Sequence, residues 1–376
     1  MGTPYGRFDD FDGLSAFEFT ADRGVVVADS LDEVVPALDA VTAATRAGHW
    51  AFGFVSYEAA SAFDAELVTR EPVPGLPLVW FGIASELGDS ALITPPSTGL
   101  VPAKEWTSEW RKADYVARVD AVKAQIADGN TYQCNLTNRL RTSFDMEPSL
   151  YYGMVANAQR SQFGSYLDIG RHVVMSASPE LFFDLNGSRL LLRPMKGTAA
   201  RGASAEADRR AVCELSSSAK ERAENVMIVD LLRNDAARIA TGGSVRVRRL
   251  LHTETYPTVH QLTTDIEARV PTGVTIAELF TALFPSGSIT GAPKVSTMRL
   301  IADLETSPRG IYCGAIGFVG TTGVGEPHSR FSVAIRTVVG DRLTGVAEYG
   351  TGSGVTWSSD AYAEYDELEV KTRILR

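Results

Sequence analysis

Apolar residues recur along the chain at two spacings, one typical of helices and one of strands. At residues 116–126 valines and an isoleucine follow helical spacing, and Gly129 is expected to end that helix. At residues 131–141 apolar and polar residues alternate, which predicts a strand whose polar face carries Gln133. We expect this polar face to meet solvent, although the same pattern is compatible with a cleft.

The first 84 residues predict a mixture of strands and helix. Ser30 and Glu33 match a capping box, and the helical pattern after them contains Pro36 and ends at Gly48. Residues 50–57 and 78–83 are typical of strands. Residues 88–104 are loop-like, with a Pro-Pro-Ser-Thr-Gly centre, and form the best candidate linker. The expected organisation is a variable N-terminal region, residues 1–104, packed on a catalytic domain, residues 105–376.

The second half of the chain continues the mixture of helices and strands. Helical patterns cover residues 205–241, 276–284, 293–304 and 361–375, and strand patterns cover residues 244–251, 311–319, 329–339 and 343–349. Short glycine-rich turns join the last three strands, which is typical of antiparallel neighbours. The predicted fold class is α+β, with antiparallel sheets packed together and helices on the outside.

Composition excludes several classes of protein. The 376 residues carry a formal net charge of −10, which argues against a partner that is nucleic acid or an anionic membrane. The N-terminus lacks a signal-peptide pattern, and no apolar run reaches membrane-spanning length. The three cysteines are too widely spaced for a disulfide framework. We therefore expect a soluble, cytoplasmic protein.

Two residues near the middle of the chain are candidates for proton and nucleophile chemistry. Lys196 follows an apolar run, and Glu180 stands in a second such run, directly after Pro179. An Asn-Gly turn at residues 186–187 predicts a hairpin that brings the two side chains together. A single lysine at a strand end is by default a solvated one. Beside a carboxylate in one cleft, however, we interpret Lys196 as a nucleophile and Glu180 as its proton partner.

Four glutamates form two pairs with helical spacing. Glu221 and Glu224 share a face of one predicted helix, and Glu364 and Glu367 share a face of the last one. Either pair alone is more often a surface feature. If the two helices face each other, the four carboxylates form an all-oxygen site, which suits Mg²⁺. Lys371 would lie on the same face, one turn after Glu367.

Two further features have both a structural and a functional interpretation. Residues 285–294 form a glycine loop that ends at a helix start, where free N–H groups favour an anion, but a plain capped helix fits equally well. His260 stands in an apolar setting, where a hydrogen-bonded core histidine is more usual than a catalytic one.

From about residue 112 to the C-terminus, the chain resembles the chorismate-utilising enzymes. This family includes anthranilate, aminodeoxychorismate, isochorismate and salicylate synthases. The resemblance rests on motifs in family order: GNTYQCNL (129–136), SPELFF (178–183), RPMKGT (193–198), KERAENVMIVDLLRND (220–235), VHQL (259–262), PSGSITGAPK (285–294), AIRT (334–337) and GSGVTWSSDAYAEYDELEVKTRIL (352–375).

The resemblance implies a set of site residues and a mechanism. Mg²⁺ would be held mainly by Glu224 and Glu367, with Glu221 and Glu364 close by. Lys196 would attack ring C2 of chorismate while Glu180 protonates the departing C4 hydroxyl, so Lys196 must first lose its proton. The positions that match substrate-binding residues of the family are Arg336, Tyr312, Lys371, Gly352, His260, Gln133, Thr198 and Thr290.

Two positions discriminate within the family. Gln133 stands where isochorismate and salicylate synthases carry a water-activating lysine, so ammonia is favoured over hydroxyl as the added group. Lys196 lies in Pro-Met-Lys-Gly-Thr, which is similar to the Pro-Ile-Lys-Gly-Thr of aminodeoxychorismate synthases and differs from the Pro-Ile-Ala-Gly-Thr usual in anthranilate synthases. The resemblance therefore implies synthesis of 4-amino-4-deoxychorismate, for p-aminobenzoate and folate.

The chain lacks a Gly-x-Cys-x-Gly glutaminase motif. The resemblance thus implies that ammonia comes from a separate glutamine amidotransferase subunit. Two alternatives stay open at this point. One is anthranilate synthase component I, with the same substrate, and the other is a catalytically silent chorismate-binding subunit.

Overall fold

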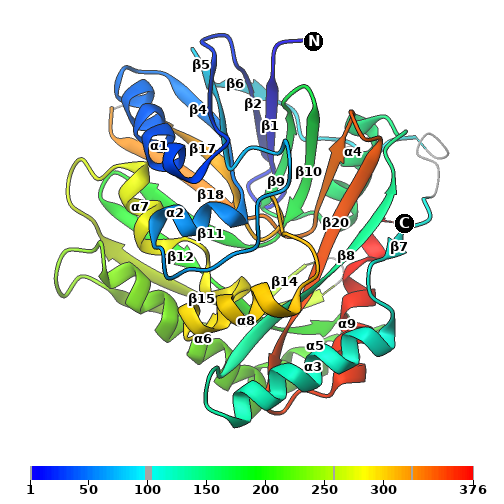
Figure 1. Ribbon diagram of the computed structural model, residues 1–376. Helices are drawn as coiled ribbons and strands as arrows, with labels where there is room; N and C mark the ends of the chain where they lie inside the picture. The colour runs from blue at the N-terminus through cyan, green and yellow to red at the C-terminus, as the bar shows by residue number, and fades with distance from the viewer. Residues whose placement is uncertain (1, 98–103, 257–258, 323–324, 376) are drawn as a thin grey trace.

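Two antiparallel β-sheets form the frame of the chain (Figure 1). The structure is a computed structural model that describes residues 2–97, 104–256, 259–322 and 325–375. Sheet A contains, in order across it, β16 (Gly291–Ala292), β8 (Gln133–Ser143), β20 (Val346–Thr356), β19 (Thr337–Asp341), β10 (His172–Ser178), β9 (Phe163–Asp168), β1 (Tyr5–Asp10), β2 (Ser15–Thr20) and β6 (Gly88–Ser90), with β7 (Thr107–Ser108) also paired to β8.

Sheet B, like sheet A, combines strands from the N-terminal and the C-terminal parts of the chain. It contains β13 (Met195–Ala200), β15 (Val259–Arg269), β12 (Arg189–Arg193), β11 (Leu181–Asn186), β18 (Pro327–Val333), β17 (Ala315–Thr321), β4 (Trp50–Val55), β5 (Val79–Ala84) and β3 (Val25–Ala28), with β14 (Arg246–Thr255) also paired to β15.

Aromatic side chains fill the space between the two sheets. Phe19 of sheet A stacks on Phe52 of sheet B with ring centroids 5.3 Å apart, and Phe8 meets Phe318 edge to face at 5.4 Å. Such pairs add to the stabilisation that comes from burying their area. This layer joins strands of the first hundred residues to strands of the last hundred, so both ends of the chain contribute to one core.

Helices cover the outer faces of the sheets. Buried residues of α1 (Leu31–Arg46), α6 (Ala219–Ala237), α7 (Ile276–Leu283) and α8 (Lys294–Leu304) share one apolar cluster with sheet B. Helix α4 (Pro148–Gln159) packs on sheet A. Helices α3 (Lys112–Ala127) and α9 (Ala361–Lys371) lie side by side against β8 and β20 (Figure 1). The remaining helices among the described residues are α2 (Ala60–Phe63), α5 (Ala205–Ser217) and three short 3₁₀ turns at Tyr57–Ala59, Gly287–Ile289 and Arg373–Leu375.

The predicted fold class is confirmed, and so are most local signals. Helix α1 begins after Ser30 with the expected capping box and runs through Pro36. Gly48 and Gly129 follow the ends of α1 and α3 with φ of 92° and 77°, values that glycine adopts at little steric cost. Asn186 pairs with Arg189 across the predicted tight turn between β11 and β12.

Two expected elements are divided in the structure. The helical region at residues 205–241 breaks at Ser218, which ends α5 and caps α6 by accepting a hydrogen bond from the Glu221 N–H. The strand expected at residues 329–339 is two strands, β18 in sheet B and β19 in sheet A. The chain crosses between the sheets at Arg336, whose φ is 53°.

The expected boundary at residue 104 stays a prediction. Its linker includes residues 98–103, which lie outside the described residues, and strands on its N-terminal side belong to both sheets. None of the helices in the described ranges combines the length and the apolar character that crossing a membrane requires.

Candidate active site

Lys196 is directed by an irregularity in its own strand. The pairing of β13 with β15 shifts by one residue between Met195 and Thr198, and Gly197 in that interval has φ of 95°. A bulge of this kind re-aims a side chain relative to the regular alternation of a strand. On the far side of Gly197, a Cβ would stand 3.0 Å from Glu221 Oε2 of α6, so glycine also permits the close approach of that helix.

The side chains of Lys196 and Gln133 both reach Gly354 of β20. Lys196 Nζ and Gln133 Nε2 each lie 2.9 Å from the point that a Cβ of Gly354 would occupy. Gln133 is fully buried, and neither its amide nitrogen nor its amide oxygen has a hydrogen-bond partner within the described residues. Leaving a buried amide without a hydrogen bond costs free energy. The Gln133 amide beside Lys196 is therefore suited to bind a polar ligand.

The expectation that the polar face of β8 meets solvent is wrong. Gln133, Asn135 and Thr137 are all buried, and they pair with Thr356, Gly354 and Gly352, respectively, of the neighbouring strand. Asn135 Nδ2 and Thr137 Oγ1 also lack partners within the described residues. Alternation in the sequence shows only that one face is polar, and here that face lies toward the second sheet and α6.

Glu180 is a buried carboxyl group that precedes β11. Burial raises its pKa to about 7, against the opposing effects of a hydrogen bond from Ser288 Oγ and the charges of Lys196 and Lys371. A second register shift, between Leu181 and Phe183 in the pairing of β11 with β18, lies directly beside it. A carboxyl group with this pKa carries its proton for a large part of the time near neutral pH, as a general acid requires.

The two glutamate pairs come from α6 and α9, and the carboxylates of the two helices influence one another. Burial and neighbouring carboxylates raise the pKa of Glu221 on α6, where Glu367 and Glu364 of α9 contribute. Burial also raises the pKa of Glu224, whose Oε1 accepts a hydrogen bond of 3.4 Å from Thr356 Oγ1 across the site. This all-oxygen set has the donor chemistry of a Mg²⁺ site, because a divalent cation would relieve the repulsion.

The carboxylates as placed do not yet form a closed metal site. Among the described residues, no three acidic, histidine or cysteine side chains converge closely enough to hold an ion. Glu367 is instead paired with Lys371, at 2.5 Å between Oε1 and Nζ. Burial acts to raise the pKa of Glu367, but the charge and hydrogen bond of Lys371 outweigh it and leave that pKa lowered.

Lys371 is the centre of a second group of predicted residues. Its Nζ donates to the carbonyl oxygen of Gly352 at 2.7 Å, and its own carbonyl accepts from Arg336 at 3.3 Å and from Tyr349 at 2.8 Å. Arg336 holds a left-handed backbone conformation, which is uncommon for a residue with a side chain and concentrates at functional sites. Two cations and a strand backbone are thereby gathered, and their binding of the substrate's carboxylates stays a prediction.

Three predicted residues have a less direct relation to Lys196. Tyr312 is buried with its ring against Gly350, two residues before Gly352. Thr290 is buried in the loop before α8 and donates to the Ser286 carbonyl at 3.1 Å. Thr198 accepts a hydrogen bond of 3.1 Å from Gln261.

His260 has both ring nitrogens engaged elsewhere. Nε2 is hydrogen-bonded with Asp208 at the start of α5 at 3.0 Å, and Nδ1 with Thr255 of β14 at 2.9 Å. This is the arrangement of a satisfied, buried histidine. Its role near the ring of a substrate stays a prediction.

Ser288 is a site residue that the sequence did not reveal. It lies in the glycine loop considered for anion binding, but its hydroxyl donates to Glu180 Oε1 and also pairs with Ser286 at 3.0 Å. The signal in the sequence was a serine inside a conspicuous loop, and nothing in the pattern indicated that this loop meets the strand of Glu180.

Comparisons with known proteins identify the family of the chain. The model of the chorismate binding enzyme family matches residues 14–376. Aminodeoxychorismate synthase component 1 of Salmonella typhimurium is 37% identical over 273 residues, which cover 73% of this chain and 59% of that protein. Aminodeoxychorismate synthase of Streptomyces griseus is 40% identical over 260 residues, covering 68% of this chain and 35% of that protein. Anthranilate synthase component 1 of Streptomyces coelicolor is 35% identical over 287 residues, covering 76% and 54%.

The chain thus spans about three fifths or less of the length of these relatives. Among solved structures, anthranilate synthase component I of Streptococcus pneumoniae matches with a TM-score of 0.78 at 24% identity, covering 100% of this chain and 91% of that one. That likeness supports the fold. By the family model and by its relatives, the chain belongs to the chorismate binding enzymes.

Proposed function

We propose that this chain is the synthase component of an aminodeoxychorismate synthase, which converts chorismate and ammonia to 4-amino-4-deoxychorismate and water. The observation that supports this most directly is that Lys196 Nζ and the unpaired amide of Gln133 both lie close to Gly354. Relatives named aminodeoxychorismate synthase, at 35% to 40% identity, favour the same activity.

In the proposed reaction, the amine of Lys196 forms a bond to ring C2 while the C4–O bond breaks. Glu180 donates its proton to the departing oxygen, which leaves as water. Ammonia then adds at C4 and the amine of Lys196 is expelled from C2. Ser288 holds the Glu180 carboxyl in position through its hydrogen bond.

Selection of ammonia over water follows from the chemistry of Gln133. An amide side chain is neutral and is not a base, so it does not activate water, but it can hydrogen-bond to an amine. Lys371 and Arg336 would bind the carboxylates of chorismate and compensate locally for the net charge of −10.

Mg²⁺ is the cofactor that the oxygen-donor chemistry of the four carboxylates favours. Glu224 and Glu367, with Glu221 and Glu364, would hold it, and the bound ion would neutralise the ring carboxylate of the substrate. To contribute to such a site, Glu367 has to exchange its contact with Lys371 for the ion.

Ammonia would come from a glutamine amidotransferase partner, consistent with the name component 1 given to the Salmonella relative. The product would serve p-aminobenzoate and folate synthesis. We place the reaction in the cytoplasm, which agrees with three free cysteines, one of them exposed.

Product analysis tests the proposal. The purified chain is incubated with chorismate, Mg²⁺ and an ammonium salt, and the products are separated and identified by mass spectrometry. We expect 4-amino-4-deoxychorismate without pyruvate. Fluorescent anthranilate together with pyruvate would assign the chain to anthranilate synthesis instead, and the absence of product even with a glutaminase partner would favour a silent subunit.

A further inference from the structure

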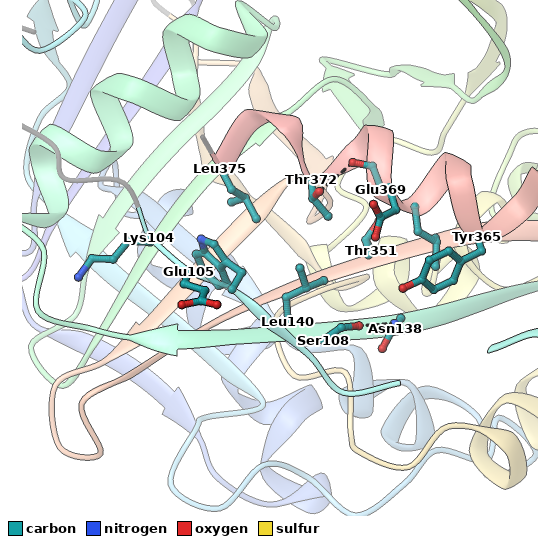
Figure 2. Close-up of a pocket in the computed structure, with 12 residues that line it drawn as sticks. Lys104, Glu105, Ser108, Asn138, Leu140, Thr351, Tyr365, Glu369, Thr372 and Leu375 are labelled. Carbon is teal, nitrogen blue, oxygen red and sulfur yellow. Dashed lines mark hydrogen bonds between the residues drawn. The ribbon is translucent and has the colours of Figure 1, made fainter. Parts of the chain in front are cut away.

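A cavity lies on a face of α9 that differs from the face of the candidate active site. Its volume is about 560 Å³, which lies in the range of small-molecule sites. Figure 2 shows side chains of α9, of β8 and β20 and of the segment 104–108 around it. Glu364, Glu367 and Lys371 belong to the active-site face of α9, whereas Tyr365, Leu368, Glu369 and Thr372 line the cavity.

The inner wall of the cavity contains a hydroxyl group without a partner. Thr351 of β20 is 3% exposed, and its Oγ1 makes no hydrogen bond within the described residues. Leu140, Leu368 and Leu375 provide apolar surface around it. Because burying an unpaired hydroxyl is unfavourable, a ligand that reaches Thr351 would gain from a hydrogen bond to it.

The rim of the cavity is negatively charged. Glu105 and Glu369 both line it, and neither carboxylate forms an ion pair with any residue that the structure describes. The one lysine at the rim, Lys104, is already paired with Asp145. Two uncompensated carboxylates above an apolar wall favour a cation with an apolar body over an anion or a neutral sugar.

We propose that this cavity binds a small organic cation, an aliphatic or aromatic ammonium compound, with its charge at Glu105 and Glu369 and a hydrogen bond to Thr351. The proposed binding does not require that the chain catalyses the proposed reaction. Thr351 directly precedes Gly352, and Thr372 directly follows Lys371, so the occupant touches both elements that carry the carboxylate-binding groups. Occupancy is therefore expected to change the KM for chorismate.

A series of three indoles tests the requirement for positive charge. Tryptamine carries an ammonium group, tryptophol carries a hydroxyl on the same side chain, and indole-3-acetate carries a carboxylate. Binding to the full chain is measured by isothermal titration and by ligand-observed NMR. We expect tryptamine to bind, tryptophol to bind several-fold more weakly and indole-3-acetate to bind weakest of the three.

Variants locate the site. Thr351→Val removes a hydroxyl without changing the shape of the side chain, and we expect about fivefold weaker tryptamine binding with no loss of thermal stability, because the hydroxyl has no partner to lose. Glu369→Gln should weaken binding about threefold, since the rim is exposed to water. Asp366→Asn is the matched control on α9, where the carboxylate pairs with Lys112 outside the cavity, and it should leave binding unchanged.

Three results would overturn the proposal: no tryptamine binding at millimolar concentration, equal binding of the three indoles, or binding that Thr351→Val and Glu369→Gln leave unaltered. If chorismate turnover is also measurable, tryptamine should shift the KM in the parent chain and less so in Thr351→Val. A chain that binds tryptamine as expected but fails to make 4-amino-4-deoxychorismate would refute the proposed function and leave this site standing.

Discussion

Replacing the buried acid Glu180 by glutamine is expected to stabilise the fold while abolishing turnover. Burial raises the pKa of Glu180 from 4.5 to about 7. The folded protein therefore binds this proton more tightly than the unfolded chain does. Its contribution to stability is fully present below about pH 4.5 and is lost as the pH rises through about 7. Glutamine is neutral at every pH and still accepts the hydrogen bond from Ser288.

The magnitude follows from the two pKa values. A difference between 4.5 and about 7 corresponds to about 3 kcal/mol of unfolding free energy, as an upper estimate for a single buried carboxyl. The advantage of Glu180→Gln over the parent chain should therefore grow by about this amount between about pH 5 and about pH 8.5. Glu58, whose pKa is also raised to about 7 by burial, is present in both proteins, so its titration cancels in the comparison.

Urea unfolding of the two proteins, followed at several pH values across this range, provides the measurement. The reasoning is refuted if the stability difference between them is the same at both ends of the range. It is also refuted if Glu180→Gln becomes the less stable protein as the pH rises, because Glu180 would then be a carboxylate that its surroundings stabilise.

Three further substitutions have distinct expected outcomes. Ser288→Ala removes a hydrogen bond that favours the charged form of Glu180, so the pKa of Glu180 should rise further. The alkaline limb of the pH–rate profile should then move to higher pH, and a limb at the same pH as in the parent chain would contradict this. Gly354→Ala places a methyl group against the ends of the Lys196 and Gln133 side chains, and should reduce kcat/KM for chorismate at least tenfold while the circular dichroism spectrum stays unchanged. Kinetics like those of the parent chain would show that Lys196 does not act beside Gly354. Gly197→Ala forces a side chain into a backbone conformation with φ of 95°, and should lower the unfolding free energy by about 1–2 kcal/mol in urea titrations, with an unchanged midpoint as the contrary result.

Local signals in the sequence predicted much of the fold because they act over a few residues. The capping box at Ser30 and the glycines that follow α1 and α3 constrain helix ends directly. The tight turn at residues 186–187 creates the hairpin of β11 and β12 that leads from Glu180 toward Lys196. The spacing of the four glutamates sets which helix faces they occupy, and the carboxylates of α9 contribute to the raised pKa of Glu221 on α6.

Long-range relations could not be predicted in the same way. The polar face of β8 was expected in solvent, since alternation does not distinguish water from a second layer of protein; Gln133 is in fact fully buried. The hydrogen bond between Ser288 and Glu180 joins residues 108 positions apart, and it depends on how the loop before α8 packs on sheet B. The crossing between sheets at Arg336 interrupts a sequence pattern that is compatible with one continuous strand.

The most direct test of the central claim is peptide mapping of the chain after incubation with chorismate and Mg²⁺ in the absence of ammonia. We expect a covalent adduct on Lys196 whose mass equals chorismate minus one water, and we expect addition of an ammonium salt to discharge it as 4-amino-4-deoxychorismate. Lys196→Ala should carry no adduct and form no product. An unmodified Lys196 after the ammonia-free incubation, in a preparation that makes product once ammonium is added, or product formation by Lys196→Ala at the parent rate, would contradict the account.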